Sequence, residues 1–188
     1  MDPLACQPSA ALSPRTVLDL AVLGVASERP RSRRELTVAV RHIGGRRFQP
    51  TVDVVAGRVG GLVAAGLLVP VADDGAETLW QPSPAGRAHI HRLLLMRSEP
   101  PVAALAALCV CLKICFLELL DGAARRAVLD DLLAAHRSAL SDAEAALAGC
   151  PCRCALVQRY LAHDIERWRA ELGWLEGLRG LIGARAEA

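Results

Sequence analysis

The segment from Arg47 to Arg87 constrains the fold of this chain more than any other stretch of the sequence. Asp53 is a predicted helix N-cap, because its carboxylate can accept hydrogen bonds from the first amides of a helix. Gly66 is expected to end that helix, since glycine adopts the left-handed backbone conformation of a helix C-terminus without strain. Between them, apolar residues recur at about the 3.6-residue helical period, at Val55, Val59, Leu62 and Val63.

A hairpin and a further helix are expected directly after Gly66. Two short β-type runs, 67–71 and 77–81, lie on either side of Asp73-Asp74-Gly75, which is a hairpin turn pattern. Ser83-Pro84 then predicts a helix start with proline at its first position. A helix, a hairpin and a helix in this order predict a winged helix-turn-helix with a two-stranded wing.

Two helices are predicted before this segment. Ser13-Pro14 caps the first, which should end near Ser27. The second should run from Arg34 to Val40 with Leu36, Val38 and Val40 as its apolar residues. Ser98-Glu99-Pro100-Pro101 interrupts the helix that follows the wing. We therefore expect a winged helix-turn-helix DNA-binding domain over residues 13–97.

Arginines are concentrated ahead of the predicted recognition helix. Seven of them and a single acid, Glu35, lie between Arg29 and Arg47. In a winged helix these turns lie near the DNA backbone, where arginine can contact phosphates, although a solvated surface is the alternative. Arg58 is the predicted base reader, because it is the one long hydrogen-bonding side chain on the recognition helix. The predicted DNA-binding residues are Arg31, Arg33, Arg34, Arg46, Arg47, Thr51, Val54, Val55 and Arg58.

The charge distribution agrees with a nucleic-acid reader in the N-terminal half. The formal net charge is only +2. Residues 1–97 carry twelve arginines and eight acids, whereas the remaining residues carry ten basic and twelve acidic groups. A basic N-terminal half that also has the pattern of a helix-turn-helix is typical of a protein that binds double-stranded DNA.

A helical dimerisation and effector-response domain is predicted over residues 98–188, with helical stretches at 102–120, 123–148 and 155–182. Apolar residues in the second and third are spaced alternately by four and three, which is typical of seams between antiparallel helices. Because a lone helix pair buries little apolar surface, we expect a partner subunit and a homodimer. The predicted dimerisation residues are Leu133, Leu140, Leu161, Trp168, Leu172 and Leu175, while His136 on the same seam is expected to be a packing residue.

The apolar run from Val102 to Leu120 approaches the length of a membrane span, but it contains Lys113 and Glu118. We therefore expect no membrane segment. The start at Met1 shows neither a basic nor an apolar signal region, so a cytoplasmic location is expected.

Six of the seven cysteines fall in two groups. Cys109, Cys111 and Cys115 lie on one predicted helix, where only Cys111 and Cys115 share a face. Cys150, Cys152 and Cys154 lie in a turn, where they could be incidental, redox-responsive, or ligands of Zn(II) or Cu(I). The incidental reading is preferred, so neither a metal nor a cofactor is predicted. Phosphate loops and hydrolase patterns are absent, which argues against an enzyme.

The same motifs resemble the PadR family of bacterial transcriptional regulators. The resemblance is carried by an aromatic residue, a proline, a short helix, a Gly-Leu hairpin start and an Ala-Gly-Arg helix start in order. It includes Phe48, Pro50, the helix from Val54, Gly66-Leu67, Ser83–Arg87, Leu20–Gly24, Arg34–Leu36, Leu112–Asp121 and Leu172–Glu176. It implies a homodimer, formed through the C-terminal helices, that releases DNA when a small, often aromatic, effector binds near the dimer interface.

The recognition helix departs from that family. Val54-Val55-Ala56 replaces its polar opening, and Arg58 is followed by Gly60-Gly61. The predicted wing carries acids, whereas a wing that enters the minor groove usually carries arginine or lysine. We therefore predict a dimeric transcriptional regulator, a repressor released by a small molecule. The alternative is a winged-helix interaction or thiol- or metal-sensing module with weak or lost sequence-specific DNA binding.

Overall fold

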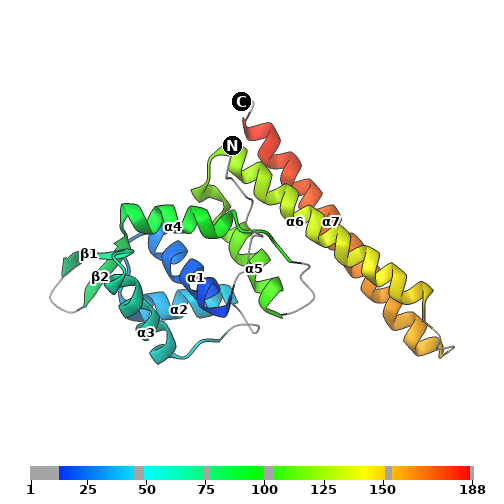
Figure 1. The fold of residues 1–188 in the computed structure, drawn as a ribbon, viewed down its shortest axis with the longest axis horizontal. Coiled ribbons are helices and arrows are strands. Elements are labelled where there is room, and N and C mark those ends of the chain that lie inside the picture. The colour runs from blue at the N-terminus through cyan, green and yellow to red at the C-terminus, as the bar shows by residue number, and fades with distance from the viewer. Residues whose placement is uncertain (1–12, 45–48, 74–76, 100–103, 151–153, 187–188) are drawn as a thin grey trace, which may run out of the picture. The chain divides into compact units, whose positions relative to one another are not determined.

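The computed structural model describes residues 13–44, 49–73, 77–99, 104–150 and 154–186 (Figure 1). The predicted fold class is confirmed: the protein is mainly helical, with one two-stranded antiparallel sheet. The elements, in chain order, are α1 (Pro14–Glu28), α2 (Arg33–Gly44), α3 (Val52–Ala64), β1 (Leu68–Asp73), β2 (Thr78–Pro82), α4 (Pro84–Leu94), α5 (Ala104–Cys115), the 3-10 turn η1 (Leu117–Leu119), α6 (Gly122–Ala148) and α7 (Ala155–Ala186).

The chain divides into two compact units. The first contains the described residues up to Arg97 together with Ala107–Leu120, and the second contains residues 98–106 and the two long helices α6 and α7. This division differs from the predicted boundary, because most of α5 belongs to the N-terminal unit. The predicted continuous helix over 102–120 is also replaced by α5 followed by η1.

Helix α1 forms the centre of the first unit. Ser13 caps it by accepting a hydrogen bond from the Thr16 amide, and Pro14 occupies its first turn. Every residue from Val17 to Ala26 is buried, because α2, α3, α4 and β2 all pack on this helix. A helix that is buried on all sides and largely apolar is expected at the core of a domain rather than on its surface.

The wing is joined to the body by specific backbone hydrogen bonds. Gly66, at φ +68°, ends α3, and the Leu67 amide bonds to the Leu62 carbonyl, which completes a glycine C-cap motif. Strands β1 and β2 pair antiparallel, with an irregularity near Val71. Arg31 exchanges both backbone hydrogen bonds with Trp80, so the chain before α2 adds a bridge to β2.

The end of α5 packs on the first unit through Phe116. Its ring occupies the space that a Cβ on Gly24 of α1 would need, so glycine is required at this close approach. Lys113, almost completely buried, donates from its ammonium to the Met96 carbonyl at the end of α4. These contacts explain why residues 107–120 group with the N-terminal elements.

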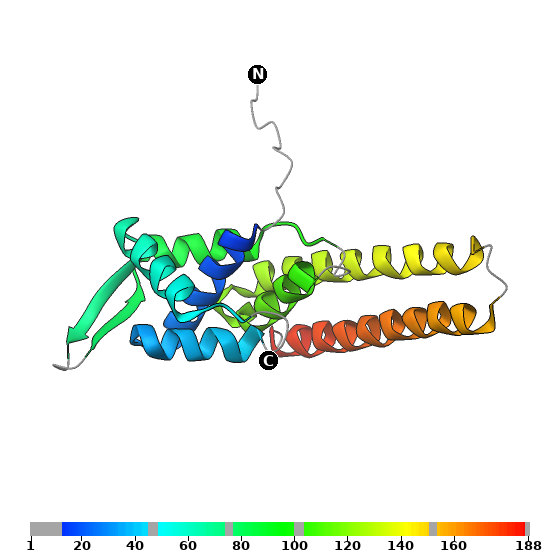
Figure 2. The same cartoon turned by 90° about the horizontal axis from the view of Figure 1, so that it is seen from below.

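Helices α6 and α7 lie side by side in the second unit (Figure 2). Their shared seam buries Leu129, Leu132, Leu133, Ile165, Trp168, Leu172 and Leu175. His136 is buried there as expected, edge-on to Trp168, with Nδ1 2.8 Å from the Leu132 carbonyl oxygen. Within the described residues, no helix is both long and apolar enough to cross a membrane.

The seam residues were predicted to join two subunits, and this assignment needs correction. Leu133, Trp168, Leu172 and Leu175 are buried between α6 and α7 of a single chain, while Leu140 and Leu161 are half-buried. The alternating spacing correctly predicts an antiparallel helix pair, but the partner of each seam is the neighbouring helix of the same chain.

Candidate nucleic-acid interface

Helix α2 begins with a reciprocal cap. The Ser32 hydroxyl accepts from the Glu35 amide at 3.3 Å, and the Glu35 carboxylate accepts from the Ser32 amide at 3.0 Å. Arg29 also donates to Glu35 at 2.6 Å. The Arg29 and Ser32 hydrogen bonds hold the pKa of Glu35 below its usual value. Glu35, the acid within the arginine cluster, therefore stabilises the N-terminus of α2.

The structure separates the three predicted phosphate-contacting arginines that it describes. Arg31 donates from Nε to the Val25 carbonyl at 3.2 Å and from Nη2 to Glu28 at 2.5 Å, so its guanidinium is held against the body. Arg33 is exposed and lies over the Trp80 ring, 5.8 Å from the centroid. Arg34 is exposed on the first turn of α2. Arg46 and Arg47 lie outside the described residues.

Helix α3 starts earlier than predicted. Thr51, rather than Asp53, is its N-cap, because the Thr51 hydroxyl accepts from the Val54 amide at 3.3 Å. Thr51, one of the predicted DNA-binding residues, is exposed beside that bond. Asp53 lies in the first turn, where its negative charge interacts favourably with the positive end of the helix dipole.

The outer face of α3 is formed by small and apolar residues. Val52, Val54 and Gly57 are exposed, whereas Val55 is completely buried together with Val59 and Leu62. The predicted DNA contact by Val55 is therefore wrong, since its side chain is part of the domain core. Val54 remains on the accessible face, where a methyl group can contact only apolar parts of a base.

Arg58 points toward the body of the domain. Its Nε and Nη2 both donate to the carboxylate of Asp19 on α1, the second at 2.9 Å. Asp19 is 4% exposed, so its charge depends on this two-pronged partner. The fork of Arg58 is thus engaged inside the unit, whereas the sequence predicted that it would extend toward base edges.

His89 of α4 lies beside this ion pair. Burial lowers the pKa of His89, and the positive charge of Arg92 lowers it further, followed by that of Arg58. Its Nδ1 is 2.5 Å from Arg92 Nη2, while its buried Nε2 has no hydrogen-bond partner among the described residues. Asp19, Arg58 and His89 therefore bring ionisable groups of α1, α3 and α4 close together.

Trp80 on β2 is the large aromatic residue of the wing. This side chain is buried beneath the ribbon and is covered by Arg33. Glu77 at the start of β2 is exposed. The turn residues Asp74 and Gly75, and the side chain of Asp73, lie outside the described part of the structure.

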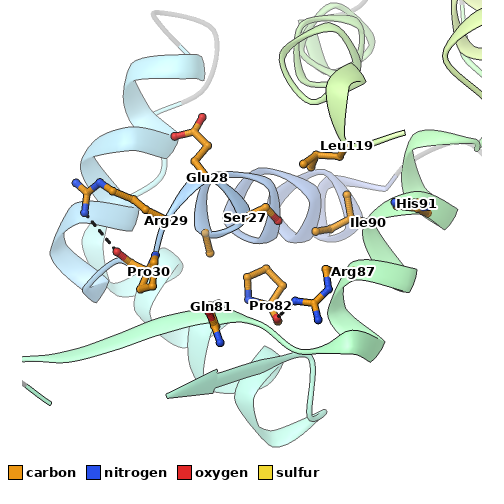
Figure 3. A pocket seen from close by; sticks show the side chains of 11 residues that line it. Ser27, Glu28, Arg29, Pro30, Gln81, Pro82, Arg87, Ile90, His91 and Leu119 are labelled. Carbon is orange, nitrogen blue, oxygen red and sulfur yellow. Dashed lines mark hydrogen bonds between the residues drawn. The ribbon is translucent and has the colours of Figure 1, made fainter. Parts of the chain in front are cut away.

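A cavity of about 260 Å³ lies between the end of α1, the end of β2 and helix α4 (Figure 3). Its apolar wall includes Ala26, Ile90 and Leu119. Arg87 lies one turn before Ile90 on α4, with Nη1 donating to the Pro82 carbonyl at 2.9 Å. This volume is slightly below the range of typical ligand pockets and suits a small molecule.

Two of the three cysteines in the predicted turn lie within the described residues. Cys150 is half-buried and Cys154 exposed, while Cys152 lies outside the described residues. Backbone amides of Val157 and Leu156 lower the pKa of the Cys154 thiol. Within the described residues, no three potential metal ligands come together.

The outer face of α7 was missed by the sequence analysis. Tyr160, Trp174 and Leu181 are exposed by 69%, 57% and 68%. They stand fourteen and seven residues apart, so they share one stripe, distinct from the seam that packs on α6. This heptad spacing is readable in the sequence, but the stronger seam pattern obscures it.

The sequence matches a family model described as "Putative AphA-like transcriptional regulator" over residues 8–179. This match confirms the predicted class, a family of transcriptional regulators, which is not an enzyme family. No curated protein matches the sequence.

Several solved structures are similar to the chain. Bacillus subtilis PadR in complex with operator DNA is 19% identical, with 88% of this chain and 99% of that chain covered and a TM-score of 0.43. The same protein in complex with p-coumaric acid is 18% identical, with 89% and 99% covered and a TM-score of 0.41. The PadR-like regulator BC1756 from Bacillus cereus is 13% identical, with 89% and 99% covered and a TM-score of 0.39.

Proposed function

Because the chain belongs to the AphA-like family of transcriptional regulators, we propose that it is a dimeric repressor that releases DNA when a small molecule binds. The observation that carries this proposal is the match of the family model to nearly the whole chain, including both units. We assign DNA binding to the elements up to α4 and dimerisation to α6 and α7. A protein of this kind acts where the chromosome is, in the cytoplasm.

The proposed DNA-binding surface is formed by the starts of α2 and α3. Arg34 is exposed there, and Arg33 has an exposed guanidinium that rests on Trp80. Such groups neutralise phosphates and contribute affinity without reading the sequence. Arg46 and Arg47 precede α3 in the chain and belong to the same proposal.

The proposed dimer contact is the outer stripe of α7. Three large side chains, Tyr160, Trp174 and Leu181, face solvent in a single chain. Aromatic residues exposed in a stripe are typical of protein–protein contacts, because they bury a large area with little loss of side-chain freedom. The seam residues then act indirectly, by holding α7 straight against α6.

The proposed effector site is the cavity between α1, β2 and α4. The adjacent segment from Arg31 forms the backbone bridge to Trp80 of β2, so a molecule wedged beside Gln81 and Pro82 would shift the wing. Arg87 can bind an anionic group on such a molecule, since its guanidinium retains donors besides the one directed to Pro82. Effector binding would thereby reposition the elements that hold α3.

The test of this function is the selection of genomic fragments by the purified full chain, followed by affinity measurements. We expect the selected site to bind at least about a thousandfold more tightly than random duplex at physiological salt. We also expect expression of a reporter gene to fall when the site lies in its promoter. A reporter that is unaffected or activated would overturn the repressor proposal.

One observation favours the alternative, an interaction module without strong sequence readout. The exposed positions of α3 include Val52, Val54 and Gly57, and Arg58 is engaged by Asp19, so few groups can read a base edge. This alternative predicts an affinity ratio near one between the best genomic fragment and random duplex. The same selection experiment therefore decides between the two functions.

A further inference from the structure

Two thiols on α5 lie together in the first unit, outside the DNA-binding surface and the cavity. Cys111 is half-buried and Cys115 is exposed, one helical turn further along. The two side chains are hydrogen-bonded to each other. Cys111 Sγ is also 3.8 Å from the carbonyl oxygen of Ile43 near the end of α2. Cys109 lies on another face of the same helix.

The helix geometry disfavours a disulfide between these thiols. Residues four apart on a helix have Cβ atoms about 5–6 Å apart, whereas a disulfide requires about 3.5–4.5 Å. A disulfide would therefore require the last turn of α5 to unwind. A cation placed between the sulfurs spans a longer distance and leaves the helix intact.

The small number of ligands selects the kind of cation. Zinc requires four ligands in a structural site, and the described residues contain no group of three candidate ligands. Thiolates are soft ligands that select copper(I) among the first-row metals. Copper(I) is also stable with two sulfur ligands, which is the number available here.

We propose that Cys111 and Cys115 form a two-thiolate binding site for copper(I). Binding replaces two S–H bonds with two S–Cu bonds and releases two protons, with no change in oxidation state. The affinity should therefore depend steeply on pH, because protons compete with the metal by up to about tenfold per pH unit for each proton released.

The site is placed to influence the DNA-binding elements. Cys111 contacts Ile43, which is followed in the chain by the segment leading to α3, and Cys115 precedes Phe116, whose ring packs at Gly24 of α1. Copper(I) would draw Cys111 away from the Ile43 carbonyl. A resulting change in DNA affinity rests on the proposed function, whereas metal binding itself does not.

The experiment uses the full chain under anaerobic reducing conditions, with Cys150, Cys152 and Cys154 replaced by serine to remove the second thiol group. Copper(I) is titrated against the chromophoric chelator bathocuproine disulfonate. We expect one copper per chain, retained in the Cys109→Ser control and lost in Cys111→Ser and Cys115→Ser. X-ray absorption should show two sulfur ligands. Circular dichroism verifies that each variant is folded. If a serine variant does not fold, the alanine variant at the same position is used instead.

Two results would overturn the proposal. One is retention of copper by the folded Cys111 and Cys115 variants, which would place the metal elsewhere. The other is a chain that holds no copper but forms a Cys111–Cys115 disulfide with peroxide, detected as a loss of two mass units. DNA binding is measured separately with the genomic fragment, so a chain that binds copper but no DNA would refute only the repressor function.

Discussion

The carboxylate of Asp19 on α1 accepts two hydrogen bonds from the guanidinium of Arg58 on α3, thirty-nine residues further along the chain. Both side chains are largely shielded from solvent. The pair therefore fixes the rotation of the recognition helix about its own axis. It also explains why the one long polar side chain of that helix does not extend outward.

Replacing Arg58 with alanine should destabilise the protein by about 3–5 kcal/mol, because it leaves the buried Asp19 carboxylate without its partner. The Arg58→Lys variant should recover little of this stability, since an ammonium group cannot donate two parallel hydrogen bonds to the carboxylate. Chemical denaturation of the variants measures this loss.

The matched control is the double variant Asp19→Asn/Arg58→Ala. Removing both charges should recover part of the lost stability, because no unpaired charge then remains buried. If Arg58→Ala keeps wild-type stability but loses only its preference for one DNA sequence, Arg58 is a base reader and does not stabilise the fold.

The sequence predicted the order of helices and strands in the first unit well, because each boundary has a local chemical cause. Ser13, Gly66 and Ser83 act as predicted at the ends of α1, α3 and α4. The start of α3 was misjudged, since Thr51 and Asp53 are both suitable N-caps and only the backbone decides between them.

The sequence could not predict contacts between distant segments. Nothing near Asp19 indicates that Arg58 will reach it, and Val38 fits an apolar pattern yet is 63% exposed. The spacing of apolar residues in α6 and α7 reveals a seam but not whether the partner helix belongs to the same chain. The pairing of Cys111 with Cys115 was visible, because helical periodicity alone places them on one face.

Two glycine substitutions should have opposite effects on stability. Gly57→Ala on α3 should stabilise the protein by about 0.5–1 kcal/mol, because alanine favours the helix and the structure has open space there. Gly24→Ala should destabilise it by about 1–3 kcal/mol, since the new methyl group would overlap the Phe116 ring. Thermal unfolding compares the two, and Phe116→Leu should partly rescue Gly24→Ala but leave Gly57→Ala unchanged.

Arg34→Ala should reduce the salt dependence of DNA binding. If Arg34 contacts one phosphate per subunit, the slope of log affinity against log salt should fall by about one per subunit. Affinity should decrease about equally for the selected site and for random duplex. Arg31→Ala is the control, because its guanidinium is held by Val25 and Glu28. Equal slopes for Arg34→Ala and wild type would remove Arg34 from the interface.

The two faces of α7 should respond differently to mutation. Trp174→Glu should yield a folded monomer, because Trp174 is exposed in the single chain and a charge there prevents apolar contact. Trp168→Ala should instead cost about 3–5 kcal/mol of stability, since this side chain fills the core between α6 and α7. Light scattering with circular dichroism distinguishes the two outcomes. A Trp174→Glu protein that remains dimeric would exclude this stripe as the contact.

The cysteines should differ in reactivity because their environments shift the thiol pKa in opposite directions. Backbone amides of Val157 and Leu156 at the start of α7 stabilise the Cys154 thiolate and lower the pKa of this thiol. The hydrogen bond that the Cys115 thiol donates to Cys111 raises the pKa of Cys115. An unperturbed thiol has a pKa of about 8.5, and only the thiolate is alkylated readily.

Alkylation by iodoacetamide below this pH should therefore modify Cys154 first and Cys115 last, although both side chains are exposed. Raising the pH should increase the Cys115 rate over a range in which the Cys154 rate is already constant. Peptide mapping by mass spectrometry follows each site, with a copper chelator present so that the α5 thiols are free of metal. Cys111→Ala is the matched control, because removing the hydrogen-bond acceptor should accelerate alkylation of Cys115 and leave that of Cys154 unchanged. Equal rates at the two sites across the pH range would show that accessibility, not the local hydrogen bonds, governs their chemistry.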